Sequence, residues 1–328
     1  KSWASRAPAL EGENAVSRPK LPTARRLIGL AVAAAACPLP GQAQEAGAAQ
    51  PGSLPAVEVV ATTPVPGIEV PKDQIPSNVQ TADDLHLRRA QSLNLPDFMA
   101  TQLPSVNVNE IQGNPFQVDV NYRGFSASPV LGTPQGLSVY QDGVRINEPF
   151  GDVVNWDLIP KAAISSITLL PGSNPLFGLN TLGGALSLQT KRGDTHPGTE
   201  LEFQAGSFGR VSTELSHGRK LANGGHLFLS FGGLNFSPSR VRQLFAKVGQ
   251  DSGRLSWDLS FTHGDNRLVG NGLLPESMLM QDRKQVYTRP DRTGNRMSML
   301  TLNGSYRLSE QQTISMTAYT RRSRYSTL

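Results

Sequence analysis

The chain has 328 residues, of which only 17% are charged, and it contains 32 glycines and 24 prolines. This composition favours a turn-rich β protein over a helical enzyme, and the length allows two domains, or one small domain and part of a larger one. The net charge is +5, but residues 1–43 alone carry six basic and two acidic side chains, so the remainder is close to neutral. Because a nucleic-acid groove needs clustered Lys and Arg in the folded part, the charge excludes nucleic acid as the expected partner.

Residues 1–43 have the pattern of a secretory signal peptide. Arg25 and Arg26 precede an apolar run, Leu27–Ala36, and small residues follow up to Ala43. An apolar run of about ten residues suits a signal peptide and is too short for a membrane-spanning helix, which needs about 20. We therefore expect export with cleavage after Ala43. The only cysteine, Cys37, leaves a lipoprotein signal as the alternative, although the usual Leu before it is missing, and a single cysteine cannot form an internal disulfide.

Residues 44–71 are rich in Ala, Pro and Gly, so they predict an extended linker. One β-prone island interrupts this linker. It consists of Val57, Glu58, Val59, Val60, Ala61 and Thr62. Taken alone, this island indicates no more than a stray strand.

The region 81–103 predicts two short helices. Thr81 is expected to cap the first helix, with carboxylates in its first turn, and Pro96 is expected to interrupt the helical stretch. The core face of these helices is expected to consist of Leu93, Leu95, Phe98 and Met99.

Short strands and turns are predicted for the region that follows, up to Lys191. Val106 and Val108 alternate with asparagines, as in a half-buried strand. A second strand runs into Arg123-Gly124-Phe125. A third ends at Asp142-Gly143, a hairpin signal because both turn positions accept positive φ. No helix longer than about two turns fits into residues 121–191.

None of the motifs in this region indicates catalysis or cofactor binding. Gly178–Gly183 has the glycine spacing of a phosphate-binding loop, but Gly184 stands where that loop needs a lysine. The carboxylates have no histidine near them in sequence, so turn or interface roles are their more frequent outcome. These carboxylates are Asp142, Glu148, Asp152 and Asp157. We expect no enzyme activity, no cofactor and no metal site.

In their order, these pieces resemble the plug domain of the TonB-dependent outer-membrane receptors, over residues 72–193. The residues that carry the resemblance are Arg123, Gly124, Phe125, Asp142, Gly143, Pro171, Gly172, Gly178, Gly183 and Gly184. The resemblance implies an α+β plug domain, and it identifies Val57–Thr62 as the TonB box, the strand that pairs with an edge of the TonB protein. It also implies that Arg123 meets carboxylates on the inner wall of a barrel. Ser126–Pro134 and Asn147–Asn155 are then expected to face the outside and touch ligand.

From Thr199 onward, apolar and polar residues alternate with a period of two. The clearest run is 255–261, and similar runs occur at 227–231, 244–248, 300–306 and 314–318. The pattern is typical of antiparallel transmembrane β-barrel strands, although a soluble sheet packed on one face would also give it. Short turns and one long polar connection, Asn266–Arg296, join the strands. About six strands are readable, whereas plugged transporter barrels have about 22, so we expect the barrel to be incomplete in this chain.

The predicted organisation is a signal peptide (1–43), a periplasmic linker with the TonB box (44–71), the plug domain (72–193) and the N-terminal part of an outer-membrane barrel (194–328). The function implied by the resemblance is TonB-energised uptake of a scarce ligand across the outer membrane of a Gram-negative bacterium. The implied ligand is a ferric siderophore or another metal chelate, and the implied partners are TonB and outer-membrane lipid. The alternatives are a passive porin or adhesin barrel, a soluble secreted β-rich enzyme or sugar-binding protein, and a truncated fragment without transport activity.

Overall fold

The computed structural model describes residues 59–61, 69–72, 75–110, 112–174, 177–236, 238–270, 272–288 and 291–328. These residues belong to one compact unit, Pro55–Leu328. The predicted signal peptide with Cys37 lies outside the described residues, as do Val57, Glu58 and Thr62 of the predicted TonB box. Within the ranges given above, no helix has the length and apolar character needed to cross a membrane.

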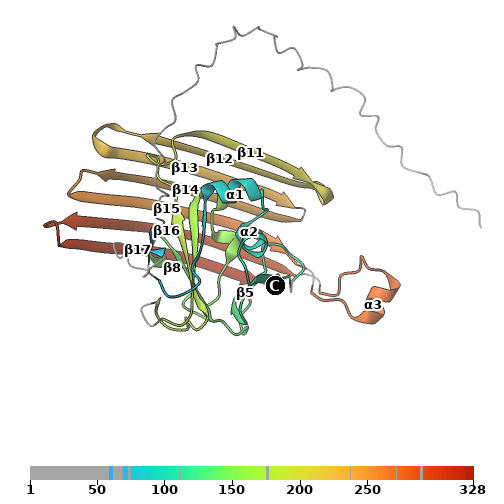
Figure 1. Ribbon diagram of the computed structural model, residues 1–328. Coiled ribbons are helices and arrows are strands. Elements are labelled where there is room, and N and C mark those ends of the chain that lie inside the picture. The colour runs from blue at the N-terminus through green and yellow to red at the C-terminus, as the bar shows by residue number, and fades with distance from the viewer. Residues whose placement is uncertain are drawn as a thin grey trace, which may run out of the picture. The chain divides into compact units, whose positions relative to one another are not determined.

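The first domain, which we call the plug-like domain, combines a mixed sheet with two short helices (Figure 1). Its five-stranded sheet has the order β3-β9-β10-β7-β8, in which β10 runs parallel to β7 and the other pairs are antiparallel. These strands are β3 (Gln80–Asp83), β7 (Leu137–Gln141), β8 (Val144–Arg145), β9 (Ile164–Pro171) and β10 (Gly184–Thr190). A separate three-stranded sheet contains β4 (Val106–Asn109), β5 (Asp119–Tyr122) and β6 (Phe125–Ala127). The α+β class is therefore as predicted.

The two predicted helices are present, but their boundaries differ from the prediction. They are α1 (Asp84–Ala90) and α2 (Leu95–Gln102). The expected cap, Thr81, lies within β3, and Asp83 caps α1 instead by accepting a hydrogen bond from the His86 amide. Pro96 does not interrupt a helix, because it stands in the first turn of α2, where proline leaves no helical hydrogen bond unmade.

Three of the four residues predicted for the core face, Leu95, Phe98 and Met99, are buried in the core of the plug-like domain, whereas Leu93 is half-buried and packs with a cluster that contains Phe116, Leu234 and Leu268. Phe98 and Met99 of α2 are fully buried and belong to the same apolar cluster as Ile167 of β9 and Leu188 of β10. Between residues 121 and 191, the described helices are the single 3₁₀ turns η2 (Trp156–Leu158) and η3 (Lys161–Ala163). This agrees with the expectation that no long helix fits there.

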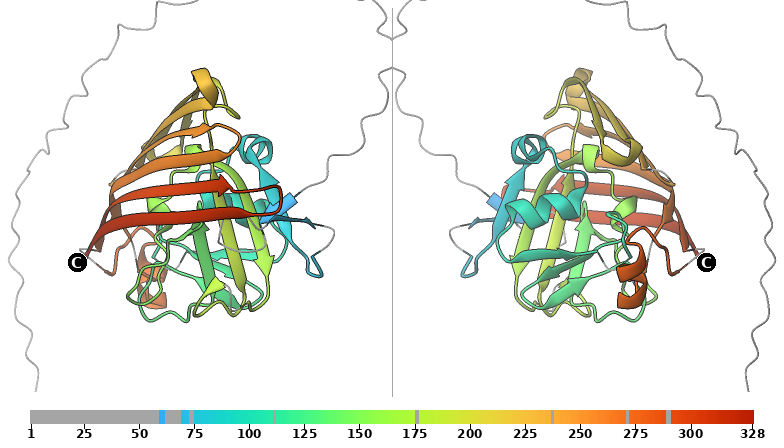
Figure 2. Two further views of the ribbon diagram at one scale, coloured as in Figure 1. Left: turned by 90° about the vertical axis from the view of Figure 1, so that its left-hand side faces the viewer. Right: turned by 90° about the vertical axis from the view of Figure 1, so that its right-hand side faces the viewer.

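The second part of the unit is a seven-stranded antiparallel sheet, which we call the large sheet. Its strands follow one another in chain order, each paired with the next. They are β11 (Gly198–Gly206), β12 (Arg210–Lys220), β13 (Gly225–Phe236), β14 (Ser239–Asp251), β15 (Leu255–Val269), β16 (Arg292–Arg307) and β17 (Thr313–Thr327). The sheet curves around the plug-like domain, which lies against one of its faces (Figure 2).

The large sheet differs from the prediction in two respects. It has seven strands rather than about six, because β11 and β12 carry too few apolar residues to show the alternation clearly. The connection predicted for Asn266–Arg296 is shorter, since β15 continues to Val269 and β16 already starts at Arg292. The remaining connection contains one helix, α3 (Glu276–Gln281), and leaves the sheet at the same end as the β11–β12 and β13–β14 turns, opposite the turns after β12, β14 and β16 (Figure 1).

The two faces of the large sheet have different chemistry, as the period-two alternation predicts. On β15, Phe261 is exposed, whereas the adjacent Ser260 and Thr262 are buried against the plug-like domain. The exposed face carries large apolar side chains on all seven strands, among them Leu201, Leu215, Leu229, Leu244, Leu300 and Met316. We call the face against the plug-like domain the inner face and the other one the outer face.

Candidate functional site

The candidate site is the contact between the plug-like domain and the inner face of the large sheet. Polar residues join the two parts, from turns of the plug-like domain on one side and from successive strands of the sheet on the other. Three apolar clusters also cross the contact: Phe116 packs with Leu234 and Leu268, Leu158 with Met297 and Met299, and Ala163 with Phe228 and Phe245. The plug-like domain is therefore held against the sheet by apolar packing together with ion pairs and hydrogen bonds.

Asp142, from the predicted Asp-Gly hairpin turn, forms a buried ion pair with the large sheet. Its backbone has φ 47, as the turn requires, and its carboxylate lies 3.1 Å from Nζ of Lys247 on β14. The carboxylate also accepts hydrogen bonds from the Thr190 amide (2.9 Å) and the Thr190 hydroxyl (2.5 Å). Asn303 of β16 donates to the Asp142 carbonyl oxygen at 2.9 Å. The residue therefore makes both the hairpin turn and an interface contact.

Asp157 makes the second buried carboxylate contact, and its partners are neutral. It lies in η2 and is 1% exposed. The side-chain amides of Asn266 on β15 and Asn295 on β16 donate to the carboxylate at 2.8–3.0 Å. Burial raises the pKa of Asp157 to about 6, although the hydrogen bonds from the two asparagines partly oppose this shift. The contact is consequently sensitive to mildly acidic pH.

Two further ion pairs join the plug-like domain to β12 and to the edge strand β17 of the large sheet. Lys161 of η3 lies 3.1 Å from Glu214 on β12. At the other side, Arg321 of β17 lies 3.2 Å from Glu148 and also donates to the carbonyl oxygens of Ile146 (2.8 Å) and Asn147 (3.1 Å). The contacts thus extend across the sheet from β12 to β17.

The connection between the two parts is itself held by ion pairs. Lys191, directly after β10, lies 2.7 Å from Asp84 of α1, and both side chains are buried. Arg192 lies 3.4 Å from Asp258 of β15, which also meets the buried His226 of β13 at 2.7 Å. This end of the plug-like domain is therefore fixed to both its own first helix and the sheet.

Several of the residues that carried the family resemblance are in contact with one another. Phe125, from Arg-Gly-Phe, packs over Gly183, where an added Cβ would lie 2.4 Å from the Phe125 side chain. The neighbouring Gly184 has φ 145, and a Cβ there would lie 2.4 Å from the Leu170 carbonyl oxygen. Motifs nearly 60 residues apart in sequence thus meet because the glycine leaves room for the ring. The other resemblance residues form turns and strand ends: Gly124, Gly143, Gly172 and Gly178 have positive φ, and Pro171 ends β9.

The contact expected of Arg123 with carboxylates on a barrel wall is not made among the described residues and stays a prediction. The Arg123 side chain is exposed, and its guanidinium lies 5.1 Å from the centre of the Tyr122 ring. Within the described ranges, Arg123 forms no ion pair with the large sheet. Cation–carboxylate contacts with the sheet are made by Lys161, Lys247 and Arg321, by Arg192 of the connection, and by Arg88 of α1, which lies 3.7 Å from Glu200 of β11. None of these had been singled out, because a lysine or arginine has no sequence signature of its partner.

The two loops expected to touch ligand lie side by side, and a third loop joins them. The Val154 amide donates to the Ser128 carbonyl at 2.9 Å, which links Ser126–Pro134 to Asn147–Asn155. The third loop runs from residue 172 to 183, and its Asn180 donates to Asp152 at 2.8 Å. Exposed apolar side chains occur in all three loops: Leu131, Phe150, Leu179 and Leu182.

Part of the predicted TonB box is an extended strand. Val59–Ala61 form β1, which pairs antiparallel with β2 (Glu69–Pro71). This small pair is separate from the other sheets. Among the described residues, no group of three or more His, Cys, Asp or Glu side chains has an arrangement that could hold a metal ion.

Comparison with known proteins identifies the same features. A family model described as the TonB-dependent receptor plug domain matches residues 71–185. The vitamin B12 transporter BtuB of Vibrio vulnificus is 26% identical over 165 residues, which are 50% of this chain and 26% of that protein. The ferric aerobactin receptor of Klebsiella pneumoniae is 29% identical over 128 residues, which are 39% of this chain and 16% of that protein. This chain therefore spans about a quarter or less of the length of these curated relatives.

Solved structures extend the similarity beyond the plug-like domain. The ferric preacinetobactin receptor BauA of Acinetobacter baumannii superposes with a TM-score of 0.64 at 12% identity, over 82% of this chain and 40% of that one. The unliganded ferric citrate transporter FecA superposes with a TM-score of 0.63 at 14% identity, over 77% of this chain and 40% of that one. At such identities the likeness concerns the fold. The chain therefore contains a region that matches the TonB-dependent receptor plug domain, and this region is continued by a sheet with the fold of these receptors.

Proposed function

We propose that this chain belongs to an outer-membrane transporter that takes up a scarce ligand, a ferric siderophore or another metal chelate, with energy supplied through TonB. The observation that carries the proposal is the plug domain seated on the inner face of a sheet, through ion pairs, hydrogen bonds and apolar clusters, while the outer face of the sheet is apolar. Such a wall separates lipid from a polar lumen, and the plug closes that lumen until something moves it. The transporter would perform no covalent chemistry, in keeping with the relatives, which are named as transporters and receptors.

Several further assignments belong to this proposal. The domain limits are those of the sequence: signal peptide 1–43, linker 44–71, plug 72–193 and barrel strands from 194. The loops Ser126–Pro134 and Asn147–Asn155 contact the ligand. The names of the relatives, which mention ferric aerobactin, ferric citrate and vitamin B12, support a metal chelate.

TonB would bind at Val57–Thr62. A partner strand can add to an exposed strand edge through main-chain hydrogen bonds, and β1 offers such a strand within this segment. Because β1 is already paired with β2 on one side, TonB would add to the free edge or take the place of β2. A two-stranded ribbon is only marginally stable in water, so either route is accessible.

The test is deletion of Val57–Thr62 from the receptor, expressed in a strain that lacks other receptors for the same ligand. Uptake from a panel of radiolabelled ferric siderophores and cyanocobalamin should fall to background, whereas binding to intact cells should stay within about two-fold. A matched control deletes Ala46–Pro51, six residues of the same linker, and should leave both uptake and binding unchanged.

Other outcomes would overturn the proposal. Unchanged uptake after deletion of Val57–Thr62 would indicate a passive channel. Purification of the receptor from the periplasm without detergent would indicate a soluble secreted protein.

A further inference from the structure

The carboxylate of Asp157 takes its hydrogen-bond partners from the large sheet. It accepts from the side-chain amides of Asn266 on β15 at 2.8 Å and of Asn295 on β16 at 2.9 and 3.0 Å. The backbone of the same turn is held in the same way, because Gln243 of β14 donates to the carbonyl oxygens of Asp157 (2.6 Å) and Ile159 (2.9 Å). All of these donors lie on the sheet, so Asp157 loses them and meets water if the plug leaves the sheet.

The other carboxylate buried at this contact is in a different position. Asp142 is paired with Lys247 and also accepts hydrogen bonds from Thr190, a residue of its own domain. Its charge is therefore matched while the plug lies against the sheet, and part of its surroundings moves with it. Asp157 forms no ion pair with any residue that the structure describes, so its charge is matched only by amide dipoles.

Burial without a cation explains the raised pKa of Asp157. Removal from water disfavours the charged carboxylate, and this raises its pKa to about 6. The groups that oppose the rise are the amides of Asn266 and Asn295 and the residue's own backbone, rather than a neighbouring charge. The protonated carboxyl is thus the form that suits the contact, and the charged carboxylate is the form that suits water.

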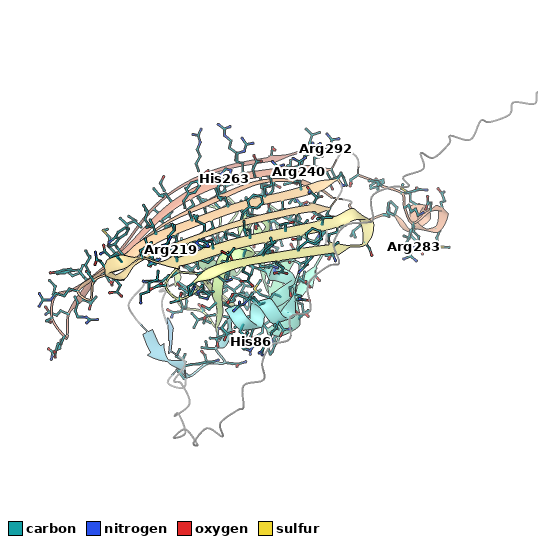
Figure 3. All side chains as sticks on the ribbon, turned by 90° about the horizontal axis from the view of Figure 1, so that it is seen from above. His86, Arg219, Arg240, His263, Arg283 and Arg292 are labelled. Atoms are coloured by element: carbon teal, nitrogen blue, oxygen red, sulfur yellow. The ribbon has the colours of Figure 1, made fainter. Side chains whose placement is uncertain are left out.

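The charged side chains around this contact are engaged elsewhere. On the inner faces of β14 and β15, the buried or half-buried ones are Lys247, paired with Asp142, and Asp258, paired with Arg192. The inner positions of β16 from residue 293 to 303 are uncharged. The charged plug residues on either side of Asp157 in sequence are paired too: Glu148 with Arg321, Asp152 with Arg145 and Lys161 with Glu214. The outer face of the same three strands, on the side away from the plug-like domain, carries Arg240, His263 and Arg292 (Figure 3).

We propose that Asp157 and its amide partners form a proton-binding site that exists only while the plug is seated, that is, in contact with the large sheet. Displacement of the plug then exposes the carboxyl group to water and releases its proton, and a mildly acidic medium holds the plug in place. The inference rests on the proposed function, because it concerns the plug that has to move during uptake. It adds a dependence on pH that originates at the contact with β14, β15 and β16.

The bound proton favours the seated state. With a pKa of about 6 when seated and the ordinary value of 3.8 when exposed, Asp157 holds its proton more tightly in the seated state. The ratio of seated to displaced plug should therefore be about tenfold higher at pH 5 than at pH 7.5. This effect is complete below about pH 4 and is lost as the pH rises through 6.

The experiment follows displacement of the plug with a buried thiol. The cysteines of the receptor, Cys37 among them, are replaced by serine, and Ala163→Cys places a thiol at a fully buried plug position that packs against Phe228 and Phe245 of the sheet. Labelling of the detergent-purified receptor by a small thiol reagent is timed at one low urea concentration that leaves the strands folded. The rate with Asp157 is divided by the rate with Asp157→Asn at each pH, so that ionisation of the thiol cancels.

Between pH 5 and pH 7.5 this ratio of labelling rates should rise about tenfold, with its midpoint near pH 6. Asn295→Leu removes a donor that favours the charged carboxylate, so it should move the midpoint to higher pH. A purely structural role of Asn295 would change the rate at every pH and leave the midpoint in place. A constant ratio would overturn the proposal, and so would a midpoint that does not move in Asn295→Leu.

Two controls separate the site from general effects of pH. Asp251→Asn, at an exposed turn, should leave the pH dependence of labelling unchanged. A thiol at the exposed position of Ser309, introduced as Ser309→Cys, should be labelled equally fast with Asp157 and with Asp157→Asn at every pH. A tenfold change at this exposed thiol as well would mean a general loosening of the protein and would overturn the proposal.

The result is separable from the fate of the proposed function. Labelling needs neither ligand nor TonB, so a receptor that fails to transport can still confirm the proton-binding site. A receptor that transports its ligand, but shows the same labelling ratio at pH 5 and pH 7.5, would refute the site and leave the transport proposal standing.

Discussion

Asp142 shows how one residue can serve a turn and an interface at once. The hairpin demands positive φ at this position, which asparagine and aspartate tolerate better than other residues with a side chain. The carboxylate then meets Lys247, and each of the two side chains is only 5% exposed. A buried ion pair adds little to stability as a whole, but removing one partner leaves an unpaired buried charge.

Replacement of Lys247 by methionine should therefore destabilise the folded protein by about 3–5 kcal/mol, because Asp142 loses its cation. The double variant Asp142→Asn/Lys247→Met should recover much of this loss, since asparagine keeps the turn without a charge. Equilibrium unfolding in detergent measures the free energy of unfolding of the single and the double variant. As a control, Arg296→Met removes a cation from the exposed pair with Asp265 and should cost less than about 1 kcal/mol. If Lys247→Met and Arg296→Met lowered the free energy of unfolding equally, the larger cost expected for breaking the buried Asp142–Lys247 pair would be contradicted.

Asp157 gives a pH dependence of defined sign. Its pKa in the folded protein is about 6, above the ordinary value of 3.8. The folded state therefore holds the proton more tightly than the unfolded state. This contribution to stability is complete below about pH 4 and is lost as the pH rises through 6.

Relative to an Asp157→Asn variant, which cannot titrate, the free energy of unfolding of the wild type should fall by up to about 3 kcal/mol between pH 4 and pH 7. Thermal or urea unfolding of both proteins across this range provides the measurement. For the control variant Asp251→Asn, at an exposed turn, the free energy of unfolding should change with pH in parallel with that of the wild type. If the Asp157→Asn profile is also parallel to the wild type, the buried carboxylate does not titrate in this range.

At the scale of elements, the plug is held together by contacts between turns that lie far apart in sequence. The Arg-Gly-Phe hairpin between β5 and β6 places Phe125 over Gly183, at the start of β10. The ring fills the space that a side chain at residue 183 would need. The two motifs are thus complementary in volume.

Substitution of Gly183 by alanine should displace the Phe125 ring and destabilise the plug by about 1–3 kcal/mol, as overpacking usually does. Proteolysis of the folded receptor should show earlier cleavage within residues 121–191. The double variant Phe125→Ala/Gly183→Ala should lose the clash and protect the plug better than Gly183→Ala alone. Gly304→Ala is the matched control, because its nearest neighbour lies 3.9 Å from the added Cβ and no strain is expected there.

Sequence reasoning recovered the elements better than the contacts between them. The Asp-Gly hairpin, the two short helices and the alternation of β13 to β17 follow from local rules, namely turn chemistry, capping and period-two burial. Gly183 and Phe125 could both be recognised as motif residues. Their contact with each other could not be predicted, since nothing local links residues 58 positions apart. The contact of Arg123 with carboxylates was expected by analogy and stays a prediction, whereas the ion pairs that Lys161, Lys247 and Arg321 make across the contact have no sequence pattern that would indicate them. β11 and β12 were indistinct because two or three apolar residues do not establish a period.

At the scale of the whole described unit, the large sheet has three surfaces with separate tasks. Its inner face offers charges and amides to the plug, the middle of its outer face is apolar, and one end of its outer face carries exposed arginines, among them Arg240, Arg267 and Arg296. A side chain that suits one surface would fail on another, because period-two alternation moves each residue to the opposite face after a shift of one position. The register given by the six strand pairs is therefore what the function depends on.

The connection between the plug and the sheet sets a limit on how far the plug can travel. Seven residues, 191–197, separate the end of β10 from the start of β11. A chain of this length spans at most about 25 Å when fully extended, and its first residues are pinned to Asp84 and Asp258. The connection therefore limits the distance between the last strand of the plug and the first strand of the sheet. Whatever force is applied from the N-terminal side, the plug can swing or unravel from β3 onward, but its last strand stays within that radius of the wall and can return to the same seat.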